Sequence, residues 1–220
     1  MNRSSLAPLC RLSAAGLIFV LLGGCGLLPS TSASPPSFYT LDNVGSAPAA
    51  RRETPAAERA AAPTLIVSPP HAASGFDSQR IIYVRDAHRL EYYAHSEWVD
   101  PPARMLAPLI VATLENSGTF RAVVLTPSAA AGELRLDSEI IRLQHDLGSQ
   151  PSRVRFTLRA YIVDNTTRQV LAWREFDEST PVASETPYGS VVAANRAVHA
   201  VLENLASFSA GAARNAAVTK

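Results

Sequence analysis

The sequence predicts a single α/β domain in which a mixed, mostly antiparallel sheet is flanked by two main helices. Short apolar runs bounded by turn-forming residues recur through the middle of the chain, which is typical of strands. A period of two is clearest over residues 153–163, where apolar residues at even positions alternate with polar ones at odd positions. Two segments, about 101–116 and 187–208, repeat apolar residues every three or four positions instead, which predicts amphipathic helices.

Residues 1–24 have the organisation of an export signal. Arg3 and Arg11 flank the start of an apolar run that is shorter than the roughly 20 residues needed to span a bilayer. The run ends in Leu22-Gly23-Gly24-Cys25, the pattern of a bacterial lipobox, so we expect cleavage between Gly24 and Cys25 and lipid attachment to the Cys25 thiol. The alternatives are an ordinary secretory signal or a signal anchor that happens to contain a cysteine.

Residues 25–63 are rich in Pro, Ala and Ser, which predicts a lipidated N-terminus followed by a flexible linker. A coil of about 38 residues has a typical end-to-end distance of roughly 35 Å and extends to about 125 Å. Ser37–Asp42 interrupts this composition with aromatic and β-branched residues and is expected to add a short strand. Gly26 after the cysteine resembles the sorting pattern of outer-membrane lipoproteins.

The composition argues against a disulfide bond and against nucleic-acid binding. The chain has two cysteines, Cys10 in the signal and Cys25 at the lipid site, so no disulfide is expected in the mature protein. Removal of the signal takes away two of the 20 basic residues and leaves 18 against 19 acidic ones. Nucleic-acid binding is therefore not expected, because it usually requires a basic excess.

The folded domain is expected over residues 64–210. Its strands are predicted at residues 64–67, 80–85, 89–94, 121–125, 133–144, 153–163 and 169–176. The strands at 80–85 and 89–94 are expected to form a hairpin. The alternation shifts phase at Ile141, which predicts a bulge in the fifth strand.

Both helices begin with a capping residue followed by proline. Asp100 is expected to be the N-cap of the first helix, and Gly118 is expected to end it. Pro108 lies inside this helix and is expected to kink it or to limit its first turns. Thr186 precedes Pro187 in the same way, and the Ala- and Gly-rich tail, residues 211–220, is expected to fray.

No group of residues predicts catalysis or metal binding. The five histidines are each expected in a surface role, because none lies at metal-ligand spacing from another ligand: His71, His88, His95, His145 and His199. The paired carboxylates Asp137 and Glu139 are expected to be neutralised by arginines on neighbouring strands. We therefore predict that the protein is not an enzyme and holds no metal or cofactor.

Two surface clusters have competing interpretations. The stripe Arg153, Arg155 and Arg159 matches lipid phosphate chemically, but a solvated sheet face with arginines paired to Glu133, Asp137 and Glu139 is favoured. Tyr92, Tyr93, His95 and Trp98 form an aromatic cluster that either covers the sheet edge or contacts a partner. Tyr92, Tyr93 and Trp98 are the candidate partner-contact residues.

The chain resembles the ABC-type transport auxiliary lipoproteins, the group that includes the PqiC-like lipoproteins. The resemblance rests on the lipobox, on the segments 38–42, 80–93, 97–106 and 114–120, and on the final helix. Residues 43–62 have no counterpart in the family pattern. The resemblance implies an α/β sandwich with a mixed sheet flanked by helices, and it brings no catalytic residue.

The resemblance also implies a function. It is that of a periplasmic accessory lipoprotein, anchored in the outer membrane, that docks an MCE-domain conduit belonging to an intermembrane lipid transport system. The partners would be the MCE-domain protein and, through it, an inner-membrane permease and an ATPase; a ring-forming partner would favour a homo-oligomer. The alternatives are a periplasmic lipid-binding carrier and an envelope-integrity lipoprotein unrelated to an ABC system.

Overall fold

The computed structural model describes residues 35–42 and 60–218. The predicted signal peptide, its cleavage site, Cys25 and most of the predicted linker lie outside the described residues. Residues 36–220 form one compact unit, and the description below concerns this unit alone.

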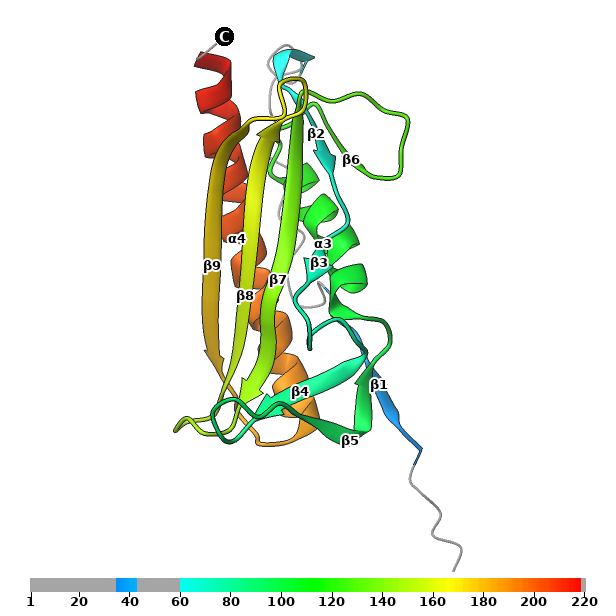
Figure 1. The fold of residues 1–220 in the computed structure, drawn as a ribbon, viewed down its shortest axis with the longest axis vertical. Coiled ribbons are helices and arrows are strands. Elements are labelled where there is room, and N and C mark those ends of the chain that lie inside the picture. Colours follow the sequence, from blue (N-terminus) through cyan, green and yellow to red (C-terminus); the bar gives the residue numbers. More distant parts are fainter. Residues whose placement is uncertain (1–34, 43–59, 219–220) are drawn as a thin grey trace, which may run out of the picture. The chain divides into compact units, whose positions relative to one another are not determined.

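Strand β7 (Leu134–Asp146) organises the sheet. On one side it pairs antiparallel with β8 (Arg153–Asp164), which in turn pairs antiparallel with β9 (Val170–Pro181). These three strands are the long ones in Figure 1, and they account for most of the antiparallel pairing. Their inward side chains are apolar, in agreement with the period of two.

The other side of β7 pairs with three short strands, all parallel to it. They follow one another along its length: β2 (Thr64–Val67), β3 (His71–Ala72) and β4 (Arg80–Val84). Thus β2 lies beside the start of β7 and β4 beside its end.

Three further strands complete the sheet. β6 (Ala122–Leu125) pairs parallel with β2. β5 (Glu91–Trp98) forms the predicted hairpin with β4, and β1 (Ser37–Tyr39) pairs parallel with the end of β5. The expectation of a short strand within residues 37–42 is therefore confirmed.

Two helices cover one face of the sheet, α3 (Pro102–Asn116) and α4 (Pro187–Val218). The core lies between them and the inward side chains of the long strands. On β8 these buried residues are Val154, Phe156, Leu158, Ala160 and Ile162. The predicted fold class, a single α/β domain with a mixed sheet and two main helices, is confirmed.

The strand predictions differ from the structure mainly at their ends. The predicted bulge is confirmed, because the β7–β8 register shifts between Ile140 and Arg142. Strand β9 continues to Pro181, five residues past its predicted end at Phe176. The charged run after Phe176 lacks an apolar alternation, but it pairs residue by residue with β8. The two-residue strand β3 was not predicted.

Two helix predictions were wrong. The N-cap of α3 is Pro101, with no side-chain cap; Asp100 instead forms an ion pair with Arg104 at 3.2 Å, one helical turn away. Gly118 follows the end of α3 with a φ of 66°, as its predicted role requires. The segment expected to fray from residue 211 is helical to Val218, because alanine has the highest helix propensity and Ala212 and Ala213 are buried.

Candidate attachment and contact sites

The segment that joins the predicted lipid site to the domain is held by side chains of both helices. The Asp42 amide donates to Asn195 Oδ1 at 2.8 Å, and Asn195 Nδ2 donates to the Thr40 carbonyl at 3.1 Å. Leu41 is buried, and its amide lies 3.5 Å from the Met105 sulfur. Together with the pairing of β1, these contacts make residues 37–42 part of the folded unit.

This anchoring changes the expected length of the linker. If residues 25–63 were one free coil, the domain could lie about 125 Å from Cys25. Because residues 37–42 are held against the domain, only ten residues, 26–35, separate Cys25 from the compact unit that begins at Pro36. Fully extended, ten residues span about 35 Å.

The predicted aromatic cluster is not one surface. Trp98 is 3% exposed and belongs to the core. Tyr92 is 49% exposed, and the guanidinium of Arg80 lies over its ring, 4.1 Å from the centroid. Tyr93 is half-buried and packs against Tyr83, with ring centroids 4.8 Å apart. The register of the β4–β5 pair shifts by three residues between Arg80 and Ile82, which interrupts the simple alternation of faces along β5.

His145 is buried, so the prediction that it has a surface role was wrong. It is 1% exposed, and its Nδ1 lies 2.9 Å from the Tyr93 hydroxyl, while Nε2 has no partner among the described residues. Burial lowers the pKa of His145 and raises the pKa of Tyr93 to about 12. The sequence missed this because His145 occupies an inward position beyond the predicted end of its strand.

The other histidines lie at the surface as expected. His71, His88 and His95 are exposed, and His199 is partly exposed, with Nε2 3.8 Å from Glu203. No group of three potential metal ligands occurs in the part of the chain that the structure describes.

The arginine stripe on β8 is a solvated, paired face, but its partners were predicted on the wrong strand. Arg155 and Arg159 bind Asp177 and Glu175 of β9, each at 2.8 Å. Only the longer contact from Arg159 to Glu139, at 3.8 Å, reaches β7. The Arg155 guanidinium is the main cause of the lowered pKa of Asp177. Strand β9 provides the closer carboxylates because Glu175 lies directly opposite Arg159, and Asp177 lies diagonally across from Arg155 on the same face.

An exposed apolar group at the start of β9 was not predicted. It consists of Val170, Leu171 and Trp173, and the Trp173 ring stacks on Tyr161 with centroids 6.4 Å apart. Among the described strands, β9 pairs only with β8, so its outer edge has no strand partner. The sequence indicates this exposure at Trp173, because Trp173 shares a strand face with the charged residues Glu175 and Asp177.

Residues 39–206 match the family described as "ABC-type transport auxiliary lipoprotein component". The chain belongs to this family. Membership confirms the resemblance found in the sequence and implies a lipid-anchored, non-enzymatic accessory of ABC-type transport.

Two solved structures resemble this auxiliary lipoprotein in fold. One is the crystal structure of a protein from Xanthomonas campestris, with a TM-score of 0.67 and 21% sequence identity, covering 84% of this chain and 99% of that one. The other is the crystal structure of an uncharacterized protein, with a TM-score of 0.61 and 12% identity, covering 79% and 98%. At these identities the likeness concerns the fold alone. No curated protein matches the chain.

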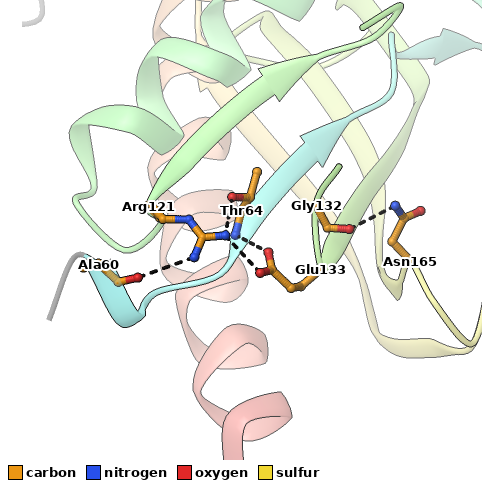
Figure 2. A network of polar contacts seen from close by, with 6 residues as sticks. All are labelled: Ala60, Thr64, Arg121, Gly132, Glu133 and Asn165. Atoms are coloured by element: carbon orange, nitrogen blue, oxygen red, sulfur yellow. Dashed lines mark hydrogen bonds and ion pairs between the residues drawn. The ribbon is translucent and has the colours of Figure 1, made fainter. Parts of the chain in front are cut away.

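A polar network lies where β2 begins, at the end of the domain opposite the β4–β5 turn, which we call the far end (Figure 2). Arg121 lies at its centre and donates to Thr64 Oγ1 and Glu133 Oε1, both at 3.0 Å, and to the Ala60 carbonyl at 3.4 Å. The Thr64 amide donates to Glu133 Oε2 at 2.7 Å, and this bond is the main cause of the lowered pKa of Glu133. The network joins the start of β2 to the residues that directly precede β6 and β7. Within the described ranges, no helix has the length and hydrophobicity needed to cross a membrane.

Proposed function

We propose that this lipoprotein is the accessory subunit of an MCE-type ABC intermembrane lipid transport system. It is anchored through Cys25 in the periplasmic face of the outer membrane and docks the conduit there. The proposal rests chiefly on the family match over residues 39–206, which covers the whole described domain except the end of α4 and residues 35–38. Its partners are an MCE-domain protein and, through it, an inner-membrane permease and an ATPase.

The anchored segment 37–42 supports a docking role over that of a mobile carrier. With about 35 Å of chain between Cys25 and the domain, the domain stays close to the leaflet that holds its lipid. A carrier that crosses between membranes needs a longer reach. The short connection therefore suits a subunit that marks one end of a conduit.

The experiment is an affinity purification of the tagged, acylated protein from detergent-solubilised envelopes, with proteins and lipids identified by mass spectrometry. Recovery of an MCE-domain protein is the expected result. Recovery of lipid without such a partner would instead indicate the carrier, and recovery of neither would favour the envelope-integrity role.

A Cys25→Ala variant is the matched control for the anchor. It should leave the membrane fraction almost completely and lose transport function while remaining folded, because Cys25 lies outside the folded unit. Full transport by this variant at normal abundance would contradict the anchored role.

Self-association is part of the proposal. Among the described strands, none pairs with the outer edge of β9, which lies beside Val170, Leu171 and Trp173. Such an edge is a common route to strand pairing between chains. Light scattering of the purified protein gives the oligomeric state, and Trp173→Ser should lower it if this edge is used. A monomer at all concentrations would remove the oligomer from the proposal.

A further inference from the structure

Most of the large exposed apolar side chains gather at one end of the domain. Five of them, between 47% and 66% exposed, come from the segments around β1, β5 and the start of α4: Phe38, Leu90, Tyr92, Val99 and Tyr188. Isolated exposed apolar residues are ordinary, but a group drawn from separate segments to one end requires an explanation. We call this end of the domain the tether end.

Hydrogen bonds and ring contacts place these segments together. β1 lies beside the last residues of β5, and the Val99 amide donates to the Tyr39 carbonyl at 2.8 Å. The Tyr39 and Tyr188 rings lie 6.4 Å apart, which brings the start of α4 to the same place. In Figure 1, β1, β5 and the start of α4 lie together at the bottom of the view, with the β4–β5 and β7–β8 turns.

Arginines accompany the apolar residues. Arg80 lies over the exposed ring of Tyr92, and Arg85 and Arg89 project from the β4–β5 turn. Between this turn and the β7–β8 turn lies an open groove of about 520 Å³, lined by four arginines, Arg85, Arg89, Arg142 and Arg155, and by one carboxylate, Asp146.

Some of this charge is already neutralised. Glu91 pairs with Arg85 and Arg89, and Asp177 pairs with Arg155. The guanidinium of Arg142 forms no ion pair within the described residues, and it lowers the pKa of the neighbouring Asp177. The groove therefore retains a guanidinium able to bind an additional anion, although the surface as a whole is only weakly basic.

The chain itself indicates what covers this end. Residue 36, where the folded unit begins, lies directly before β1, and ten residues separate it from Cys25. A lipid on Cys25 therefore brings a bilayer surface to within about 35 Å of β1. Tyr side chains favour the membrane–water interface, Phe and Leu side chains insert at its apolar boundary, and guanidinium groups bind lipid phosphates.

We infer that the tether end of the domain rests on the bilayer that holds its own lipid, with Phe38, Tyr92 and Tyr188 in the interface and the arginines of the groove against lipid phosphates. This inference builds on the proposed anchor at Cys25. Its consequence is an orientation: β9, about 36 Å long, carries Trp173 and the far end away from the membrane.

The test measures the depth of two labels on the acylated protein in vesicles of phosphatidylethanolamine and phosphatidylglycerol. The mature chain has one cysteine, Cys25, which is expected to be blocked by lipid, so Ala87→Cys and Thr166→Cys each provide a single labelling position. Ala87 lies in the exposed β4–β5 turn and Thr166 in the exposed β8–β9 turn. A fluorophore at residue 87 should be quenched by bilayer-located quenchers and shielded from aqueous iodide, and one at residue 166 should behave oppositely.

Substitutions show whether the proposed surface causes the difference. Phe38→Ser, Tyr92→Ser and Tyr188→Ser combined should make the residue-87 label as accessible to iodide as the residue-166 label. Trp173→Ser is the matched control at the far end and should leave the residue-87 label shielded from iodide. All four side chains are exposed, so folding should persist, and unchanged near-ultraviolet circular dichroism checks this. Equal accessibility of both labels in the unsubstituted protein would overturn the inference.

A second form of the protein separates this inference from the anchor. A histidine tag at position 25, bound to a nickel-chelating lipid, provides a tether of the same length without acylation. If the native protein does not float with vesicles, the proposed anchor fails. The label comparison on the tagged form then still decides whether the tether end contacts the bilayer. In the tagged form, a residue-87 label that is quenched from the bilayer and shielded from iodide would support the inference. Equal accessibility of the residue-87 and residue-166 labels to iodide would overturn it.

Discussion

The two ends of the sheet expose apolar side chains in different ways. At the tether end, Phe38, Tyr92 and Tyr188 come from segments up to 150 residues apart. Arg80 lies over the Tyr92 ring, and the neighbouring β4–β5 turn carries further arginines. At the far end, Val170, Leu171 and Trp173 are nearly consecutive on one strand whose outer edge has no partner among the described strands. A dispersed set with basic neighbours suits a fluid bilayer surface. A continuous strand edge suits another protein chain.

The polar groups behind the two surfaces also differ. Behind the tether end, His145 and Tyr93 form a hydrogen bond of 2.9 Å, and His145 is fully enclosed. At the far end, the Arg121–Glu133 pair is open to solvent, each side chain being more than 40% exposed. Buried polar groups depend strongly on their partners, whereas exposed ion pairs contribute little. Substitutions at the tether end should therefore have the larger effects on stability.

The largest expected difference is between the two tryptophans. Trp98→Ala should lower the free energy of unfolding by about 3–5 kcal/mol, because it removes a buried aromatic ring from the core. Trp173→Ala should lower it by less than about 1 kcal/mol, because that ring is 63% exposed and loses mainly its stacking on Tyr161. Urea unfolding of both variants measures this, and equal midpoints would contradict the assignment of Trp98 to the core.

The next largest effect concerns the anchored segment. Asn195→Ala should make residues 37–42 easier to open by about 2 kcal/mol, because it removes hydrogen bonds to the Asp42 amide and the Thr40 carbonyl. Hydrogen exchange of the Phe38 to Leu41 amides measures this opening. Arg196→Ala, on the exposed neighbouring position, is the control and should leave exchange unchanged. Unchanged exchange in Asn195→Ala would mean that the pairing of β1 and the burial of Leu41 hold the segment without it.

The predictable parts of this protein are those with a strong local pattern. The alternation over residues 153–163 and the apolar periodicity of α4 depend on which face is buried, so they were found from the sequence. The bulge was found because a phase shift is itself a local pattern. The composition of residues 37–42 differed enough from the linker to predict a strand, but not its attachment to Asn195, 153 residues away from Asp42.

The contact surfaces were less predictable because they depend on pairing between distant segments. Tyr92, Tyr93 and Trp98 are close in sequence, but the register shift in the β4–β5 pair distributes them between the surface and the core. Conversely, Phe38 and Tyr188 give no joint signal in the sequence and are brought to one end by the fold. The partners of the β8 arginines were misassigned for the same reason, since β8 has neighbours on both sides.

A smaller, pH-dependent effect is expected from His145. Its pKa is lowered by burial, although Glu185 and Asp146 oppose the shift, so in mild acid the unfolded chain binds a proton that the folded protein does not. The contribution of this histidine to stability is therefore complete above its unfolded pKa of 6.5 and is lost as the pH falls below it. His145→Gln should reduce the slope of unfolding free energy against pH between about 7 and 5. A slope in His145→Gln that equals the slope of the unsubstituted protein would contradict the burial of His145.

The smallest effect is expected from the far-end ion pair, and it tests the comparison most closely. Glu133→Ala alone should cost more than Arg121→Ala, because it leaves the amide of the buried Thr64 without its acceptor at 2.7 Å, whereas Arg121→Ala removes the longer bonds to Thr64 Oγ1 and the Ala60 carbonyl. A double-mutant cycle removes that difference and isolates the ion pair, for which we expect a coupling of about 0.2–1 kcal/mol that decreases with added salt. The similarly exposed Arg155–Asp177 pair provides a matched reference. A coupling well above 1 kcal/mol at high salt would show that the far end is held as tightly as the tether end, and the contrast between them would then concern their exposed side chains alone.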